Sequence, residues 1–199
     1  MNGATRNFIN IILALICVSI LGGLGYLVWN GGESFVPENF VKAREKSAGI
    51  ATELVVILDS SIKNLDKISE EDMGGRFSSA LELVGEETEK IDQVRTLALE
   101  LSGELNNMAQ AVQGIVPVSA KNIALEAVTQ EVSLIGHLIN YNAYFGGLLA
   151  SLKMKFIDDI KYDSNDVQSF IDSMNKEKDE VNSINESFNQ RLRDFDGAL

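Results

Sequence analysis

The sequence predicts an all-α protein in which an N-terminal transmembrane helix is followed by a long antiparallel four-helix bundle of the coiled-coil type. Two observations predict this fold class. An uncharged apolar run covers residues 8–29. Beyond it, four long segments repeat their apolar residues every three or four positions, which is the spacing of an amphipathic helix. The expected organisation is a tail over residues 1–7, an anchor over 8–29, a linker over 30–36 and the bundle over 37–199.

The composition excludes several classes of protein. The chain of 199 residues holds 17 Lys and Arg against 29 Asp and Glu, a net charge of −12, with one cysteine and one histidine. An acidic chain without a basic block binds nucleic-acid phosphates poorly, so no nucleic-acid partner is expected. One cysteine cannot form an internal disulfide. One cysteine and one histidine cannot build a zinc site of the Cys/His type.

The first segment, residues 8–29, reads FINIILALICVSILGGLGYLVW and has no charged side chain. As a helix it is about 33 Å long, enough to cross the hydrocarbon core of a bilayer. The alternative is a cleaved signal peptide, but its apolar stretch usually has about 7–15 residues and ends at a small-residue cleavage site, which this sequence lacks. We expect an uncleaved single-pass anchor, in which Cys17 is inert and Ser19 with Gly23 could pack against a second copy.

Two opposing signals bear on the orientation of this anchor. Lys42, Arg44 and Lys46 on its C-terminal side outnumber Arg6 and the α-amine on the other side, which favours a cytoplasmic bundle. A short charged tail ahead of a signal-anchor favours the opposite orientation. We expect the N-terminus inside and the bundle outside the cytoplasm.

The first two bundle helices follow the linker. Pro37 suits a first helical turn, because its missing N–H would be unpaired there in any case. The apolar stripe of the first helix, over residues 40–68, consists of Ala51, Leu54, Leu58, Ile62 and Leu65, with Val55 and Ile57 beside it. Gly74 and Gly75 suit the turn that follows. The second helix has a heptad stripe interrupted only by Glu87: Phe77, Ala80, Val84, Ile91, Val94, Ala98, Leu101, Leu105, Met108, Val112 and Ile115.

The third helix, expected at about residues 120–161 with Ser119 as its N-cap, has no charged residue between Glu131 and Lys153. A second membrane span over residues 132–152 is therefore an alternative. We prefer a largely buried bundle helix, because the histidine, asparagines and tyrosines of this segment would be costly in lipid.

The fourth helix starts after a capping cluster of Asp163, Ser164 and Asn165. Its apolar stripe alternates with faces of Asp, Glu, Lys, Asn and Ser. The stripe consists of Val167, Phe170, Met174, Val181, Ile184, Phe188, Leu192 and Phe195. Short connections between consecutive helices predict that neighbours run antiparallel.

The sequence contains no motif that predicts catalysis, a metal or a cofactor. A di-iron bundle needs Glu-x-x-His, but Leu134 stands three residues before His137, the only histidine. No phosphate-binding loop and no nucleophile elbow occurs. The paired acids at 86–87 and 158–159 diverge around a helix, so we expect solvated faces there. We predict no enzyme, no metal and no cofactor.

One uncharged polar face on the third helix is a candidate interaction or ligand face. It consists of His137, Asn140, Tyr141 and Tyr144, which share one side of a helix because they stand at i, i+3, i+4 and i+7. The polar groups could pair with neighbouring helices inside the bundle. They could instead contact a protein partner or line a pocket for a small ligand. We prefer internal packing.

The predicted function is that of a single-pass membrane protein whose helical bundle acts by protein–protein interaction, as a scaffold or accessory subunit of a membrane complex. Its expected partners are the membrane, through residues 8–29, and another protein or a second copy of the chain. The alternative is an extracytoplasmic bundle of the sensory type that binds a small ligand on the face of His137.

Overall fold

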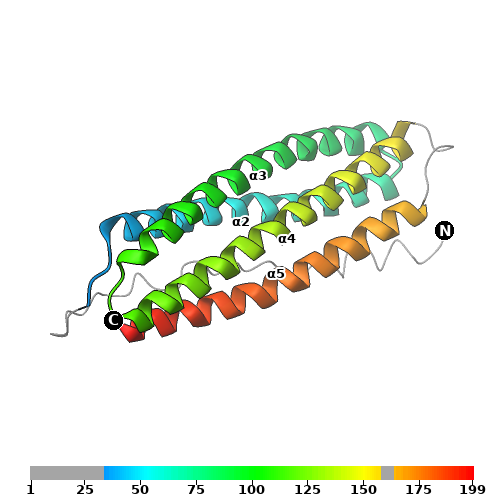
Figure 1. The fold of residues 1–199 in the computed structure, drawn as a ribbon. Coiled ribbons are helices and arrows are strands. Elements are labelled where there is room, and N and C mark those ends of the chain that lie inside the picture. The colour runs from blue at the N-terminus through cyan, green and yellow to red at the C-terminus, as the bar shows by residue number, and fades with distance from the viewer. Residues whose placement is uncertain (1–33, 158–163) are drawn as a thin grey trace.

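The computed structural model describes residues 34–157 and 164–199, so the predicted anchor over residues 8–29 lies outside the described residues. The described residues form four long helices side by side along one axis (Figure 1), which confirms an all-α four-helix bundle. These are α2 (Glu38–Met73), α3 (Phe77–Ala111), α4 (Val118–Ile157) and α5 (Ser164–Ala198), with a short 3₁₀ helix, η2 (Val112–Gly114), after α3.

The turn between α2 and α3 contains the two glycines that predicted it. The N–H of Gly75 donates to the carbonyl of Asp72 at 3.0 Å, and the N–H of Arg76 donates to the carbonyl of Glu71 at 2.9 Å. These are the paired bonds of a Schellman motif. Gly75 has a φ of 69°, a left-handed conformation that costs glycine little because it has no Cβ.

The connection from α3 to α4 lies beside the chain that leads into α2. Phe35 and Val116 exchange backbone hydrogen bonds of 3.0 and 2.9 Å, which make the single β-bridge of the described residues. Because α4 begins at Val118, Ser119 lies inside its first turn and is not the N-cap that we expected.

The hydrophobic core runs along the bundle, and the middle of the α3 stripe lies in it. Leu101 and Leu105 are both 0% exposed. Phe77, predicted to be buried, is 49% exposed. It is the first residue of α3, at the end of the bundle, where only Phe156 stacks on it, with ring centroids 6.0 Å apart. Leu97 was not on the predicted stripe and is buried.

The predicted stripes are only approximate guides to burial. Six of their apolar residues are half-buried rather than buried: Val55, Ile57, Ile62, Ile91, Phe170 and Ile184. Polar and charged residues are buried in the same helices: Ser47, Ser61, Asn64, Glu87, Glu177 and Asn185. The angle at which two neighbouring helices approach decides which edge of a stripe is covered, and periodicity alone does not contain that angle.

Helix α4 packs against α3 on one side and α5 on the other. Gly147 brings it close to α5, because a Cβ at this position would collide with the ring of Phe170. No helix in the described part of the chain combines the length and the apolarity that a membrane crossing requires. Residues 132–152 lie within α4, which packs in the bundle.

Candidate functional site

The polar face predicted on the third helix lies on α4, where this helix contacts α5. His137 Nδ1 is 2.7 Å from Glu177 Oε2, and Asn140 Nδ2 donates to Glu177 Oε1 over a longer distance of 3.5 Å. His137 and Asn140 stand one turn apart on α4, and Glu177 comes from α5. One carboxylate thus links the two helices.

The two tyrosines of this face contribute mainly to packing. Tyr141 is 7% exposed, and burial raises its pKa to about 12, so the phenol stays neutral near pH 7. Tyr144 is half-buried and packs against the same core. The structure therefore brings His137 and Asn140 together on Glu177, and it leaves the tyrosines outside that hydrogen-bond cluster.

Glu177 is the residue of this cluster that sequence reasoning missed. It is 8% exposed. In the sequence it stands three residues after Met174 and four before Val181, which are both buried on the stripe of α5. A charged residue at a core position of an apolar stripe is the signal that could have found it, since carboxylates are rarely buried without a partner.

The His137–Glu177 pair resembles the base and orienting group of many hydrolases, but its surroundings differ from such a site. The two side chains are 29% and 11% exposed. Nucleophilic catalysis also needs a nucleophile within hydrogen-bond reach of the imidazole. Within residues 34–157 and 164–199 no group of three or more His, Cys, Asp or Glu residues could hold a metal. The geometry supports a link between α4 and α5.

A second carboxylate, Glu87, joins α2 and α3. We expected it on a solvated face, and this was wrong: Glu87 is 0% exposed. Its Oε1 accepts hydrogen bonds from Asn64 Nδ2 and Lys90 Nζ, both at 2.7 Å, and Lys90 Nζ also donates to Ser60 Oγ at 2.8 Å. Glu87 occupies a heptad position, so the rotation of α3 that buries its apolar stripe also buries this carboxylate. The acidic pair at 158–159 lies outside the described residues.

A third carboxylate, Glu131 on α4, is 2% exposed. Burial raises its pKa to about 7, and the positive charge of Arg44 on α2 opposes part of that rise. Arg44 Nη1 in turn lies 3.2 Å from Asp196 Oδ1 on α5. Glu131 Oε1 has no hydrogen-bond partner among the described residues. Its carboxyl therefore changes protonation near neutral pH.

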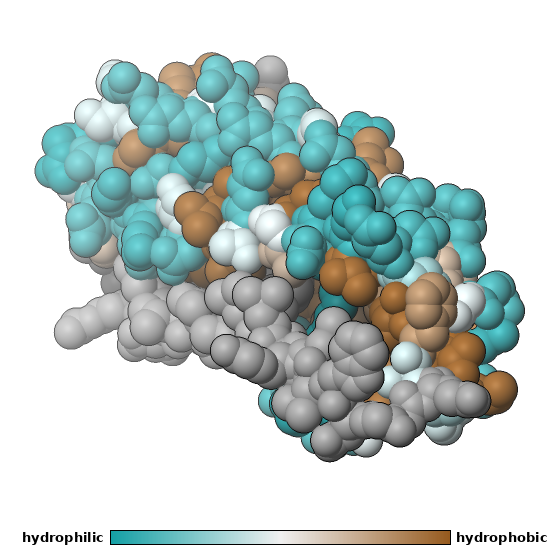
Figure 2. Space-filling view, turned by 90° about the vertical axis from the view of Figure 1, so that its left-hand side faces the viewer, coloured by the Kyte–Doolittle hydropathy of each residue, from teal (hydrophilic) through white to brown (hydrophobic). Residues whose placement is uncertain are grey.

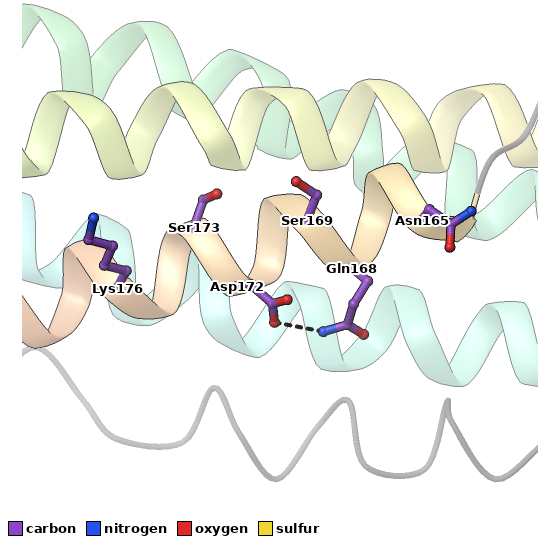
Figure 3. Close-up of a pocket in the computed structure, with 6 residues that line it drawn as sticks. All are labelled: Asn165, Gln168, Ser169, Asp172, Ser173 and Lys176. Carbon is purple, nitrogen blue, oxygen red and sulfur yellow. Dashed lines mark hydrogen bonds between the residues drawn. The ribbon is translucent and has the colours of Figure 1, made fainter.

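A depression of about 470 Å³ lies on α5, and none of these three carboxylates lines it. Figure 3 shows its lining, in which Gln168 Nε2 donates to Asp172 Oδ1 at 2.8 Å. The described residues that line it all belong to one helix: Asn165, Gln168, Ser169, Asp172, Ser173 and Lys176. These described lining residues are all polar or charged, whereas ligand pockets are usually mainly apolar.

Buried carboxylates between helices are thus the main polar feature of the bundle. Glu87, Glu131 and Glu177 belong to α3, α4 and α5, and each is hydrogen-bonded to, or feels the charge of, a residue of another helix. Comparison with protein-family models, curated proteins and solved structures finds no match for this chain. Its function is therefore inferred from its residues and their geometry.

Proposed function

We propose that the protein is a single-pass membrane-anchored helical bundle that acts by protein–protein interaction, as a scaffold or accessory subunit of a membrane complex. The observation that carries the proposal is the uncharged apolar run over residues 8–29, directly ahead of the bundle. The bundle lies outside the cytoplasm and the tail inside. Binding, without catalysis or a cofactor, is the proposed activity.

The shape of the bundle supports this function. Its helices have 35 to 40 residues, so each is about 50–60 Å long. A rod of this length offers long lateral surfaces for contact with a partner. The interhelical carboxylate contacts help to hold the four helices in one arrangement, which keeps such surfaces in fixed positions.

The small-ligand alternative has less support from the geometry. It requires the face of His137 to offer free polar groups to a ligand. His137 and Asn140 already bind Glu177, and Tyr141 is part of the core. Internal packing therefore accounts for this face without a ligand.

Membrane attachment is tested by fractionating cells that produce either the full chain or a chain that starts at residue 33. After a wash with alkaline carbonate, the full chain should stay in the membrane and the shorter chain should not. Recovery of the full chain as a soluble form that starts near residue 30 would contradict the anchor. Retention of both chains would show that residues 8–29 are not what attaches the protein.

The interaction function is tested in the same membranes. Chemical cross-linking before solubilisation, followed by affinity purification in mild detergent and mass spectrometry, should capture the full chain in a defined complex. A full chain that cross-links neither to another protein nor to itself would refute the proposed function.

A further inference from the structure

The outward face of α4 carries an apolar seam that the bundle does not bury. Leu125, Val132 and Ile139 stand seven residues apart and are 44%, 53% and 42% exposed. Smaller residues lie between these three on the same face of the helix. Together they form a row in which consecutive members are alternately four and three residues apart along the sequence. We define the α4 seam as Leu125, Thr129, Val132, Gly136, Ile139, Ala143, Gly146 and Ala150.

The seam is distinct from the core-facing side of the same helix. The buried residues of α4, such as Leu134, Leu138 and Phe145, fall at other heptad positions. All members of the α4 seam are exposed except Gly146, which is half-buried. Alternating steps of four and three are the pattern of a helix that packs along another helix. Helix α4 thus has one apolar side for its own bundle and a second side on which, among the described residues, only Gly146 lies against another helix, beside Ile91 of α3.

The seam also differs in charge from the rest of the surface. Helix α4 has no charged residue between Glu131 and Lys153, whereas the whole chain carries 29 acidic and 17 basic residues. Figure 2 shows that hydrophilic residues cover most of the upper part of one side of the bundle, whereas several hydrophobic residues lie together at its lower right. A continuous exposed apolar face on such a molecule marks an interaction surface.

We propose that the α4 seam binds the α4 seam of a second copy of this chain, with the two helices antiparallel. This inference rests on the proposed interaction function, because it identifies the interaction partner as a second copy of the chain. It does not depend on the anchor.

The sizes of the seam residues favour this partner and this direction. In an antiparallel pair centred on Gly136 and Ile139, each large side chain meets a small one of the second copy. Leu125 then faces Ala150, Val132 faces Ala143, Ile139 faces Gly136 and Thr129 faces Gly146. A parallel pair would instead place each residue opposite itself, so the large residues would hold the helices apart and leave voids beside the glycines.

Charge favours the same partner. Two copies that each carry a net charge of −12 repel one another over most of their surfaces. The α4 seam is uncharged and is its own complement, as a two-fold symmetric contact requires. Two copies can therefore meet along it without bringing carboxylates together.

The main test compares two glycine substitutions in the full chain, purified in mild detergent. Gly136→Glu places a charge at the centre of the seam. Gly103→Glu makes the same change on the outward face of α3. An added Cβ at either glycine meets no atom within 4 Å, so both variants should fold. Sedimentation should show a dimer for the unmodified chain and for Gly103→Glu, and Gly136→Glu should weaken dimerisation by at least about tenfold, because like charges oppose each other in the contact.

A chain that is monomeric at all concentrations, or a dimer that Gly136→Glu leaves intact, would overturn the proposal. Membrane retention of the Gly136→Glu variant is measured alongside. A variant that loses dimerisation and stays anchored separates this contact from the anchor. A chain that dimerises through the seam and is washed out of the membrane would contradict the proposed anchoring alone.

Disulfide cross-linking tests the direction of the pair, with Cys17 replaced by serine. Leu125→Cys and Ala150→Cys are prepared as separate proteins. In the antiparallel pair neither should cross-link with itself, and a mixture of the two should cross-link. Efficient cross-linking of each variant with itself would show a parallel contact and refute the antiparallel arrangement.

Discussion

Replacement of Glu131 by glutamine should make the stability of the bundle less dependent on pH. Burial raises the pKa of this carboxyl from 4.5 to about 7. The folded state therefore binds the proton more tightly than the unfolded state, so the stabilisation is complete below pH 4.5 and is lost as the pH rises to 7. At about 1.4 kcal/mol per pH unit, the loss is about 3 kcal/mol of unfolding free energy. Glutamine stays neutral at every pH, so the Glu131→Gln variant should not lose this unfolding free energy as the pH rises.

The assay is urea unfolding of residues 33–199, followed by circular dichroism between pH 4 and pH 8. This segment should be soluble and almost wholly helical, because its four helices share one core. Glu131→Gln should match the unmodified segment at pH 4 and exceed its stability by about 3 kcal/mol at pH 8.

The matched control is Glu126→Gln, on the same helix. Its carboxylate is 56% exposed and pairs with Arg191, so the change should be within about 1 kcal/mol at every pH. A difference between Glu131→Gln and the unmodified segment that does not vary with pH would refute the reasoning.

The remaining predictions use the same unfolding assay at pH 7. Leu101→Ala should cost about 2–5 kcal/mol because Leu101 is 0% exposed, and Leu99→Ala should stay within about 0.5 kcal/mol because Leu99 is 63% exposed; equal losses would mean that the buried side of α3 is misplaced. Asn64→Ala removes a 2.7 Å hydrogen bond to Glu87 and should cost about 1.5–3 kcal/mol, and no measurable loss would show that this bond is not made. Tyr144→Phe should change stability by less than about 0.5 kcal/mol, since no described residue hydrogen-bonds its hydroxyl; a larger loss would show a role beyond packing.

The buried interhelical contacts could not be predicted from the sequence, although several of the residues that make them were identified as unusual. His137 and Asn140 were singled out as a polar face, but their partner Glu177 lies 40 residues from His137 along the chain. Which residue of α5 meets His137 depends on how far the two helices slide along each other, and sequence periodicity does not contain that register. Glu87 was recognised as an interruption of a stripe and was still expected in solvent.

The apolar seam on α4 was also beyond sequence analysis. An apolar residue such as Val132 on a helix with few charges is compatible with the core, with lipid and with an exposed contact. Only the packing of α3 and α5 against α4 shows that Val132 and Ile139 remain exposed. Burial is a property of neighbouring helices and not of one helix alone.

The sequence by itself determined the all-α class, the number of bundle helices in the described part of the chain and the approximate ends of each. These depend on local physics: the spacing of apolar residues, and turn residues such as Gly75 that adopt a positive φ. The tertiary structure alone decided which side of each stripe is buried, which carboxylates are shared between helices and which face of α4 stays open. Those outcomes depend on the crossing angle and register of packed helices, which side chains from all four helices set together.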